Sequence, residues 1–515
     1  MKTLYILIIS LMCSALLQAQ YLAKVDKQSI SNLSIGEQQQ IYKVDSRYYS
    51  YLGLNLGKHS VGDTSLYNAY GDLRDDDPAF RQKQTLWRPV VAITGDCIVT
   101  NLFDTYVVGE DFTHVGFASW GRNLKAGFPW GSGWEWDHDR FGMNFLAHPY
   151  GGGTFFIAAR ANGYNFWESA PFVLFGSYMW KIFGETGVPE RNDLLATTVG
   201  GVFFGEIFYR LGSNVLDDRT TGWERFGREL AAAVLSPTRT WARFTEGKLF
   251  RVTSEEVYQT EPLNVTLSSG LRVVNNELSF LTGSTNLWLS VMLDYGNPFE
   301  FTSRKPFDCF NVSMDLTKGM GRKTLDYITG YGILFGKNYE SGGLKMLIGG
   351  FQHWDYFDNW AFEMGTMAFG PGIISKLPIS SNSNLYTNFH VGVVPFGANS
   401  TQLGPDTSQF RDYNFVGGAE TKLESTLQLG SWVNVVFIGY YFWMHTYVGA
   451  PGDHYVGLIK PRIELKLFSN LSIGFEHQVY YSDRYTRDYG DYHKVLTEQR
   501  VFLSFLFENF KEQKE

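Results

Sequence analysis

The clearest pattern in the chain is an alternation of apolar and polar residues with a period of two, which begins after about Pro262. Residues 286–295, 308–316 and 459–467 each place apolar side chains on one face and mostly polar ones on the other, as strands with one oily face do. About a dozen such segments reach the C-terminus, most with the roughly 10 residues that a spanning strand needs. This repetition favours an antiparallel transmembrane β-barrel of about 12 strands over residues 262–510, with a secreted β-sandwich as the alternative.

The polar face of these strands is the predicted lining of the barrel lumen. In the segment 459–467, isoleucine, proline and leucine alternate with charged residues, and the predicted lumen-facing residues are Lys460, Arg462, Glu464 and Lys466. Glu476 and Gln478 extend the same mixed-charge wall. Turn-forming residues such as Gly283-Ser284 and Asn297-Pro298 separate the strands.

A different pattern precedes the strands. From about Trp87 to Thr253, apolar residues recur at helical spacing, which predicts a helical module over residues 86–253. A helix is predicted over residues 154–161, after a loop formed by Gly151, Gly152 and Gly153.

Three further helix boundaries follow from local signals in this module. Ser169-Ala170-Pro171 is typical of a helix start, because proline is favoured in the first turn. Asn192 can cap a helix that runs to about Arg210. An amphipathic helix is predicted over residues 223–235, where Ser236-Pro237 ends it. Together with the strands, the module makes the predicted fold class α+β.

The N-terminus has the features of an export signal. A basic start at Lys2 precedes an apolar run, and Leu17-Gln18-Ala19 offers small residues for cleavage, so residues 1–19 are predicted to be a signal peptide. Residues 20–85 are polar and irregular, which predicts an extended leader. No later segment is a convincing transmembrane helix, so an integral protein would have to span as a barrel. Cys97 and Cys309 remain after cleavage and could pair in an oxidising compartment.

Composition narrows the possible partners. Aromatic residues make up 17% of the chain, a surplus that aromatic girdles at both membrane interfaces would explain. The formal net charge is −8 and no dense Lys/Arg stripe is present, which argues against a nucleic-acid partner. The expected partners are outer-membrane lipids and a periplasmic protein, and the expected location is the outer membrane of a Gram-negative envelope.

The unusual polar residues lie in the helical module. In chain order they are Trp136 to Asp139, Asn144, His148-Pro149, Arg160, Asn162-Gly163, Asn192-Asp193 and Gly205-Glu206. This ordered set, over about residues 85–250, resembles a domain of unknown function found in exported proteins of Bacteroidota. The resemblance implies export and a helical module placed before an outer-membrane barrel, but it supplies no reaction and no catalytic residues.

Several interpretations of these residues stay open. In the simplest one, the module is a helical plug whose buried charges pair with one another. In the sharper one, a catalytic site uses some of the candidates His148, Arg160, Glu185, Asp193 and Glu206. No metal and no cofactor are predicted, because the paired Glu-x-x-His elements of di-metal bundles are missing from the sequence.

A lipid hydrolase would need a serine–histidine pair, with His148 as base and Ser169 or Ser177 as nucleophile. Neither serine lies in a Gly-x-Ser-x-Gly elbow. His353 and His390 lie in the strand half, where a single histidine is more often a girdle or lumen residue than a base.

The preferred function is a non-enzymatic barrel that forms a plugged or gated passage for a small polar solute or an envelope lipid. An outer-membrane enzyme acting on lipid or lipopolysaccharide is the second hypothesis. A structural or docking barrel is the third.

Overall fold

The computed structural model describes most of the helical and strand regions of the chain. The described residues are 84–127, 133–136, 139–254, 256–275, 280–300, 304–318, 324–400 and 413–508. The predicted signal peptide, almost all of the predicted leader, and Asp137 and His138 lie outside them, so those interpretations stay predictions.

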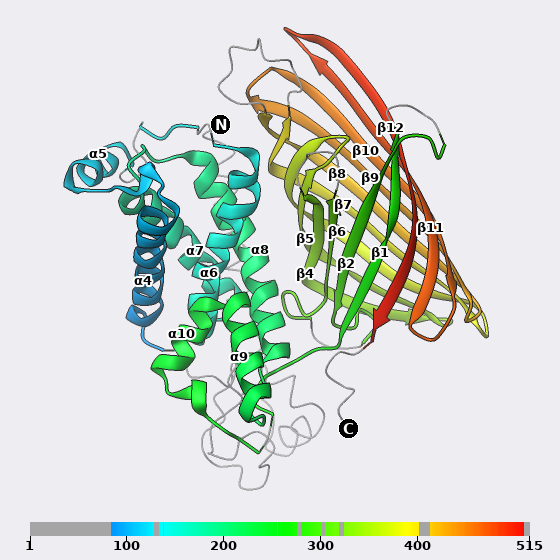
Figure 1. Cartoon of the computed structure of the whole chain (residues 1–515), viewed down its shortest axis with the longest axis horizontal. Coiled ribbons are helices and arrows are strands. Elements are labelled where there is room, and N and C mark those ends of the chain that lie inside the picture. The colour runs from blue at the N-terminus through cyan, green and yellow to red at the C-terminus, as the bar shows by residue number, and fades with distance from the viewer. Residues whose placement is uncertain are drawn as a thin grey trace, which may run out of the picture. The chain divides into compact units, whose positions relative to one another are not determined.

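Helices make up the part of the described chain before the barrel (Figure 1). The seven α-helices found among the described residues are α4 (Trp87–Phe103), α5 (Phe117–Gly127), α6 (His148–Ala161), α7 (Phe166–Met179), α8 (Arg191–Val215), α9 (Gly222–Leu235) and α10 (Pro237–Thr245). Three π-helical turns extend this set, at η2 (Asp104–Val108), η4 (Met143–Ala147) and η5 (Trp180–Gly184).

Twelve antiparallel strands close into one barrel, with β1 hydrogen-bonded to both β2 and β12 (Figure 1). The strands are β1 (Leu263–Asn275), β2 (Ser284–Tyr295), β3 (Phe310–Lys318), β4 (Leu325–Ser341), β5 (Leu344–Asp358), β6 (Glu363–Ser380), β7 (Ser383–Ser400), β8 (Tyr413–Leu429), β9 (Val433–Val448), β10 (Gly452–Lys466), β11 (Leu471–Thr486) and β12 (Gly490–Phe507). The predicted 12-stranded barrel is confirmed. The alternative of an open β-sandwich is wrong, because the sheet has no free edge.

The barrel wall has the predicted polarity. On β2, Asn286 and Ser290 are buried, whereas Leu287 between them is 58% exposed. On β10, Lys460 is only 3% exposed and the neighbouring Ile459 is 47% exposed. Polar side chains therefore face the interior and apolar ones face outward, which is the reverse of a water-soluble protein.

Contacts divide the chain into two compact units. The first contains residues 1–113, 154–179 and 208–260, and the second contains residues 114–153, 180–207 and the barrel. The second unit shows where its own helical segments lie. The Gln352 side chain on β5 donates to the Val199 carbonyl of α8 at 3.0 Å, and the Trp354 ring lies 4.5 Å from the Phe204 ring.

These contacts are made on the outer face of β5. Asp355 lies between Trp354 and Tyr356 in the sequence and points the other way, because its carboxylate meets the Lys422 ammonium of β8 across the interior. Trp354 and Tyr356 therefore point outward, and the helical segments of this unit lie against the outside of the wall. The prediction of a luminal helical plug is wrong for these segments, because the interior is filled by the barrel's own side chains.

Two helix starts differ from the sequence prediction for physical reasons. α7 begins at Phe166 rather than near Ser169, because Asn165 and Glu168 cap each other's backbone N–H groups at 3.0 Å. α6 includes the three glycines that were predicted to form a loop. The reason is close packing on α8, since a Cβ on Gly152 would lie 2.0 Å from the Thr197 carbonyl oxygen and 2.9 Å from the Gly201 Cα.

Two segments of the described chain, residues Trp87–Val108 and Arg191–Val215, are long and apolar enough to cross a membrane by length and composition. The second is mostly buried, as a core helix would be, and the first is mostly exposed. The sequence predicted a helix from Asn192 to about Arg210 but no convincing transmembrane helix. Cys97 and Cys309 are both free thiols, so the disulfide left open by the sequence is not formed.

The adjacent glycines of α6 provide a matched test of this packing. We expect Gly152→Ala to destabilise the protein by about 2 kcal/mol or more, because the added methyl group has to push α8 away. Gly151→Ala meets no atom within 4 Å and should be stabilising by up to about 1 kcal/mol, since alanine favours a helix over glycine. Thermal unfolding of both purified variants in detergent measures the difference. Equal stability of the two would contradict the α6–α8 contact.

Candidate functional site

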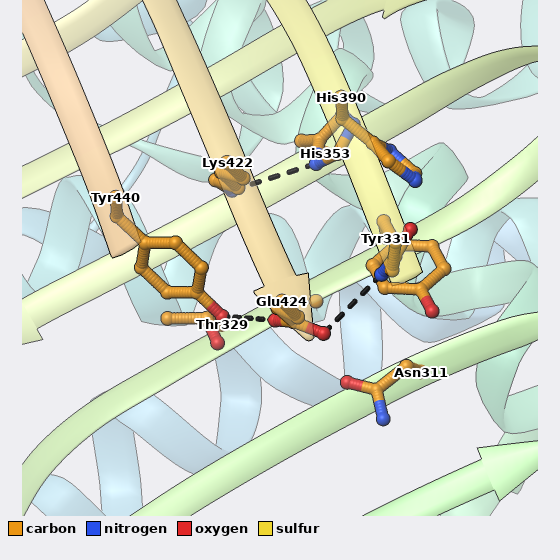
Figure 2. Close-up of a pocket in the computed structure, with 10 residues that line it drawn as sticks. Asn311, Thr329, Tyr331, His353, His390, Lys422, Glu424 and Tyr440 are labelled. Atoms are coloured by element: carbon orange, nitrogen blue, oxygen red, sulfur yellow. Dashed lines mark hydrogen bonds between the residues drawn. The ribbon is translucent and has the colours of Figure 1, made fainter. Parts of the chain in front are cut away.

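The barrel interior contains a polar pocket, shown in Figure 2. Its lining comes from strands β3, β4, β5, β7, β8 and β9 and includes Asn311, Thr329, Tyr331, His353, Asn388, His390, Lys422, Glu424 and Tyr440. The enclosed space among these residues is about 10 Å³, roughly what a single water molecule needs. In this state the pocket therefore has no room for a solute.

A buried lysine lies at the centre of the charge network beside the pocket. The Lys422 ammonium contacts the two Asp355 carboxylate oxygens at 2.6 and 2.8 Å and the Glu420 carboxylate at 3.3 Å. The Thr366 hydroxyl donates to Asp355 at 2.9 Å. Buried charges are tolerated when they are paired and hydrogen-bonded in this way, so this network is a satisfied part of the interior.

Two histidines pair next to that lysine. His353 Nε2 and His390 Nδ1 are 2.9 Å apart, so one ring must donate to the other. The Lys422 ammonium lies 3.4 Å from the other nitrogen of His353, as Figure 2 shows. His390 Nε2 is buried without a hydrogen-bond partner. The two residues that the sequence treated as isolated strand histidines therefore form one unit in the lumen.

Glu424 faces the pocket from the opposite side. Its carboxylate accepts hydrogen bonds from the Tyr440 hydroxyl and from the Asn388 amide, the latter at 3.2 Å. Tyr331 stacks at an angle on His390, with ring centroids 4.8 Å apart. The pocket thus offers a carboxylate and aromatic faces, while its ammonium is already committed to Asp355 and Glu420.

A second charge network fills another part of the lumen. The Arg500 guanidinium pairs with Asp315 at 2.6 Å and Glu498 at 2.5 Å, and it lies over the Trp288 ring at 4.4 Å. Arg462 pairs with Glu476 at 2.6 Å.

The predicted lumen-facing residues take different places in this interior. Lys460 of β10 donates to the Tyr327 hydroxyl of β4, on the far side of the barrel, at 3.1 Å. Arg462 also contacts Glu464 at 3.2 Å, and Lys466 is half-buried at the end of β10. Lys460, Arg462 and Glu464 therefore take part in luminal contacts.

Apolar side chains from opposite walls of the barrel also meet in the lumen. The Phe362 ring, on the turn between β5 and β6, lies 5.8 Å from the Tyr480 ring of β11. Phe357 of β5 lies 6.3 Å from Phe442 of β9. The turn is held in place by the Asn359 side chain, which accepts from the backbone N–H groups of Ala361 and Phe362. One buried apolar cluster joins strands β4, β5, β6 and β8 to β12 in this region, so the lumen is constricted here.

The helical segments of the second unit hold a separate charge cluster. The Lys181 ammonium, on η5, contacts Glu185 at 2.5 Å and Glu190 at 2.8 Å, and it also pairs with Asp193. His148 Nε2 lies 3.1 Å from the Asp193 carboxylate. We refer to these five residues as the Lys181 cluster.

The structure brings together three of the five candidates proposed from the sequence, namely His148, Glu185 and Asp193. Glu206 is fully buried, but it follows Asp193 by 13 positions on α8, which is about 20 Å along the helix axis. Arg160 belongs to the first unit, where it donates to the Tyr164 carbonyl at 3.1 Å and covers the Tyr209 ring.

The cluster is connected to the barrel wall by amide side chains. Asn192, beside Asp193, donates to Asn144 at 2.9 Å. Asn144 in turn donates to the Tyr413 hydroxyl of β8 at 2.7 Å. This chain of bonds holds the cluster at a defined position relative to β8.

The carboxylates of Glu185, Glu190 and Asp193 are close enough to hold a metal ion together. However, the Lys181 ammonium contacts all three, and so it lies where a cation would have to bind. The arrangement is that of an internal salt bridge, and we derive no metal chemistry from it.

Burial and neighbouring charges shift the titration of this cluster. Burial raises the pKa of the Glu190 carboxyl to about 8, and the Asp193 and Glu185 carboxylates add to that effect against the Lys181 ammonium. Burial lowers the pKa of His148, but the adjacent Asp193 carboxylate more than offsets this, so the net pKa of the imidazole is raised. Both groups therefore hold their protons to higher pH in the folded protein.

Lys181 and Glu190 of the cluster, and Glu420, Lys422 and Glu424 of the lumen, were not among the residues predicted from the sequence. A signal existed in both places. Lys181 and Glu185 are four residues apart, as helical ion pairs are. The three β8 charges alternate with apolar or neutral residues at a period of two.

Removal of the central ammonium is a direct test of the Lys181 cluster. We expect Lys181→Met to destabilise the protein by about 3–5 kcal/mol, because the substitution leaves buried carboxylates without their counter-charge. Chemical unfolding in detergent measures the change. Lys125→Met on α5, where the lysine is exposed, is the control and should change stability by less than about 0.5 kcal/mol. A small effect at Lys181 would show that the cluster is not energetically coupled.

The raised pKa of Glu190 predicts a dependence of stability on pH. Below pH 4.5, the ordinary pKa of this carboxyl, both states hold its proton and the contribution to stability is complete. As pH rises towards about 8, the unfolded chain releases the proton while the folded chain keeps it, so stability falls. His148 acts in the same direction. The measurement is the free energy of unfolding at pH values from 4.5 to 8. Its fall with pH should be smaller in Glu190→Gln and unchanged in Glu110→Gln, where the carboxyl is exposed.

Comparison with known proteins gives a family match for the helical segment and fold likenesses for the chain. A family described as a domain of unknown function (DUF3943) matches residues 133–238, which include the Lys181 cluster. This confirms the resemblance to a domain of unknown function, over a shorter range than expected. No curated protein matches the chain.

Solved structures similar to this chain include porins and an outer-membrane channel. They include the NanC porin, at 8% identity over 47% of this chain and 98% of that one, with a TM-score of 0.27. The outer membrane channel DcaP of Acinetobacter baumannii matches at 6% identity over 48% of this chain and 96% of its own, with a TM-score of 0.22. The anion-selective porin from Comamonas acidovorans matches at 9% identity over 48% of this chain and 98% of its own, also with a TM-score of 0.22. These likenesses are too weak to carry an argument about what this chain does, and the barrel rests on its own strand pairing.

Proposed function

We propose that this chain is an integral outer-membrane β-barrel whose lumen is a gated passage for a small polar solute, closed in the state described here. The observation that carries the proposal is the polarity of the closed wall. Apolar side chains such as Leu287 and Ile459 face outward, and charged ones such as Lys460 and Arg500 face inward. A closed barrel with an apolar outside is stable in a bilayer because no backbone hydrogen bond is left open.

The gate in this proposal is the constriction around Phe362 and Phe357. Twelve strands enclose less space than the 16 or 18 strands of open porins, and here aromatic rings from the turn and from opposite strands occupy that space. A solute would have to displace this turn. The helical segments of the second unit lie outside the wall, so they are not the gate.

The charges of the pocket support a preference for cations. Asp355, Glu420 and Glu424 supply three carboxylates around the pocket, and the Lys422 ammonium pairs with two of them. A small cation or a solute with an amino group would meet the Glu424 carboxylate and the Tyr331 ring, both suited to positive charge.

Removal of the gate tests this function. We expect the wild-type barrel in planar bilayers to be nearly silent and Phe362→Ala to give a severalfold larger conductance, because the substitution removes the ring that reaches Tyr480. The open variant should be cation-selective, and Glu424→Gln in that background should reduce the selectivity. Single-channel current and reversal potential in a salt gradient are the measurements.

The matched control is Phe369→Ala on β6, which removes a ring from the outward face of the barrel. This variant should stay silent. If the Phe362 variant stays silent although its barrel is intact, the gate is rejected. If the conductance rises only when helical residues are deleted, the helices and not the aromatic constriction block the lumen.

A further inference from the structure

In its described part, the first unit contains residues 84–113, 154–179, 208–254 and 256–260. Its helices expose large apolar surfaces, and many of its charged side chains pair inside the unit. We infer that this helical unit lies in the lipid bilayer, with α4 and η2 exposed to acyl chains and with the aromatic faces of α9 and α10 in the membrane interface. The inference does not rest on the proposed passage, because it uses only contacts within this unit.

The first observation is the exposed surface of α4 and η2. Val99 is 66% exposed and Val107 is 69% exposed. The other large hydrophobic side chains exposed on this segment are Trp87, Val91, Ile98, Leu102, Phe103, Tyr106 and Val108. An apolar surface of this extent is far outside what a single water-exposed helix normally carries.

Two polar side chains in the middle of the same segment bond within the unit. The Asp96 carboxylate accepts a hydrogen bond from the Thr154 hydroxyl of α6 at 2.5 Å, and the Asn101 amide donates to the Thr113 carbonyl at 3.0 Å. Arg88, next to Trp87 at the end of the segment, pairs with Glu246 at 3.5 Å and its side chain is 39% exposed. The exposed surface of the segment is therefore mostly hydrocarbon, whereas an amphipathic helix of a soluble protein exposes its polar side.

The dimensions of the segment match a bilayer. Trp87–Val108 has 22 residues, which is about 33 Å at 1.5 Å per residue and close to the roughly 30 Å of the hydrocarbon core. Trp87 is at one end and Tyr106 is near the other. These residue types are enriched where a span meets the lipid headgroups.

The second, independent observation comes from α9 and α10. On α9, Trp223, Phe226, Leu230 and Val234 are exposed along one face, and Trp223 is 87% exposed. The charged face of α9 is turned inward, where Arg225 contacts Asp218 at 2.9 Å and Glu229 at 2.7 Å.

Asp218 is the centre of this inner ion-pair network. It is buried and also pairs with Arg243 of α10 at 3.0 Å and with Arg251 at 2.8 Å. Trp241 and Phe244 of α10 are exposed on the outside. Aromatic and aliphatic faces with tryptophan at the edge are what interfacial helices present to lipid.

A lipid bilayer is the one partner that fits both surfaces. A protein partner would cover one patch, usually with a polar rim around an apolar centre. Here exposed apolar residues lie along a full-length helix and two shorter ones, while buried charges such as Asp218 and Arg243 pair inside the unit. The amount and arrangement of exposed hydrocarbon therefore fit acyl chains.

Site-directed spin labelling of the full chain in phospholipid vesicles tests the inference. In a cysteine-free background, single labels are placed by Val99→Cys on α4 and Leu230→Cys on α9. Leu271→Cys on the outward face of β1 is the lipid-exposed reference, and Asp111→Cys in an exposed polar turn is the water-exposed reference. Collision with oxygen, which partitions into lipid, is compared with collision with a water-soluble nickel complex.

We expect the Val99 label to match the Leu271 label, with severalfold higher oxygen and severalfold lower nickel accessibility than the Asp111 label. The Leu230 label should fall between the two references. High nickel accessibility at Val99 would place α4 in water and overturn the inference. Low accessibility to both reagents would also overturn it, since another protein segment would then cover the helix. The Leu271 reference confirms in the same samples that the barrel is inserted.

Discussion

The structure depends on the need to pair every backbone hydrogen-bonding group of a sheet whose outer surface is hydrocarbon. Twelve strands meet this need by closing β1 on β12 over residues such as Val265 and Phe507, so the sheet has no edge. Once the sheet is closed, one face of each strand lies on the outside of the barrel and the other face lines its interior. The outer face carries leucine, isoleucine and phenylalanine, and the inner face carries the charged and hydroxyl side chains.

Placing polar side chains inside the barrel creates a second requirement. Each charge placed in the lumen must find a partner there, because an unpaired buried ion costs several kcal/mol. Lys422, Arg500 and Arg462 each contact at least two carboxylates. Lys422 and Arg500 each reach one carboxylate three strands away in the ring, whereas Arg462 pairs with its own strand and with the adjacent β11. These networks brace the cylinder across its interior. Together with the aromatic constriction they explain why the lumen is narrow, and they are also the groups that a permeating solute would meet.

The helical segments also pair their buried charges within the protein. The Lys181 cluster buries one ammonium among three carboxylates, and the first unit buries Asp218 among three arginines. In the first unit the charged side of α9 faces inward, so the helices expose their apolar sides. Reversed polarity is therefore a property of this unit as well as of the barrel wall, and both follow from charge pairing within the protein and hydrocarbon outside it.

The sequence by itself determined the parts of this protein that are local and periodic. The alternation in 286–295 and 459–467 is sufficient to identify strands, because side chains of a strand point alternately to its two faces. The number of such segments predicted the barrel. The same local reasoning failed at Gly151–Gly153, which lie in α6, because Gly152 is required by the Thr197 carbonyl of another helix and no local pattern records that contact. It also predicted a plug, because helical periodicity does not say on which side of a wall a helix packs.

Only the tertiary structure decided which charges meet. Lys181 joins Glu190 and Asp193 through a π-helical turn, and His353 joins His390 across two strand pairings. The sequence gives no reason to prefer Glu185 over Glu206 as a partner of Asp193. In the structure Glu206 lies about 20 Å from Asp193 along the α8 axis. Pairing of this kind depends on distances between elements. Those distances are set by strand register and helix crossing, and neither quantity can be read from a residue and its neighbours.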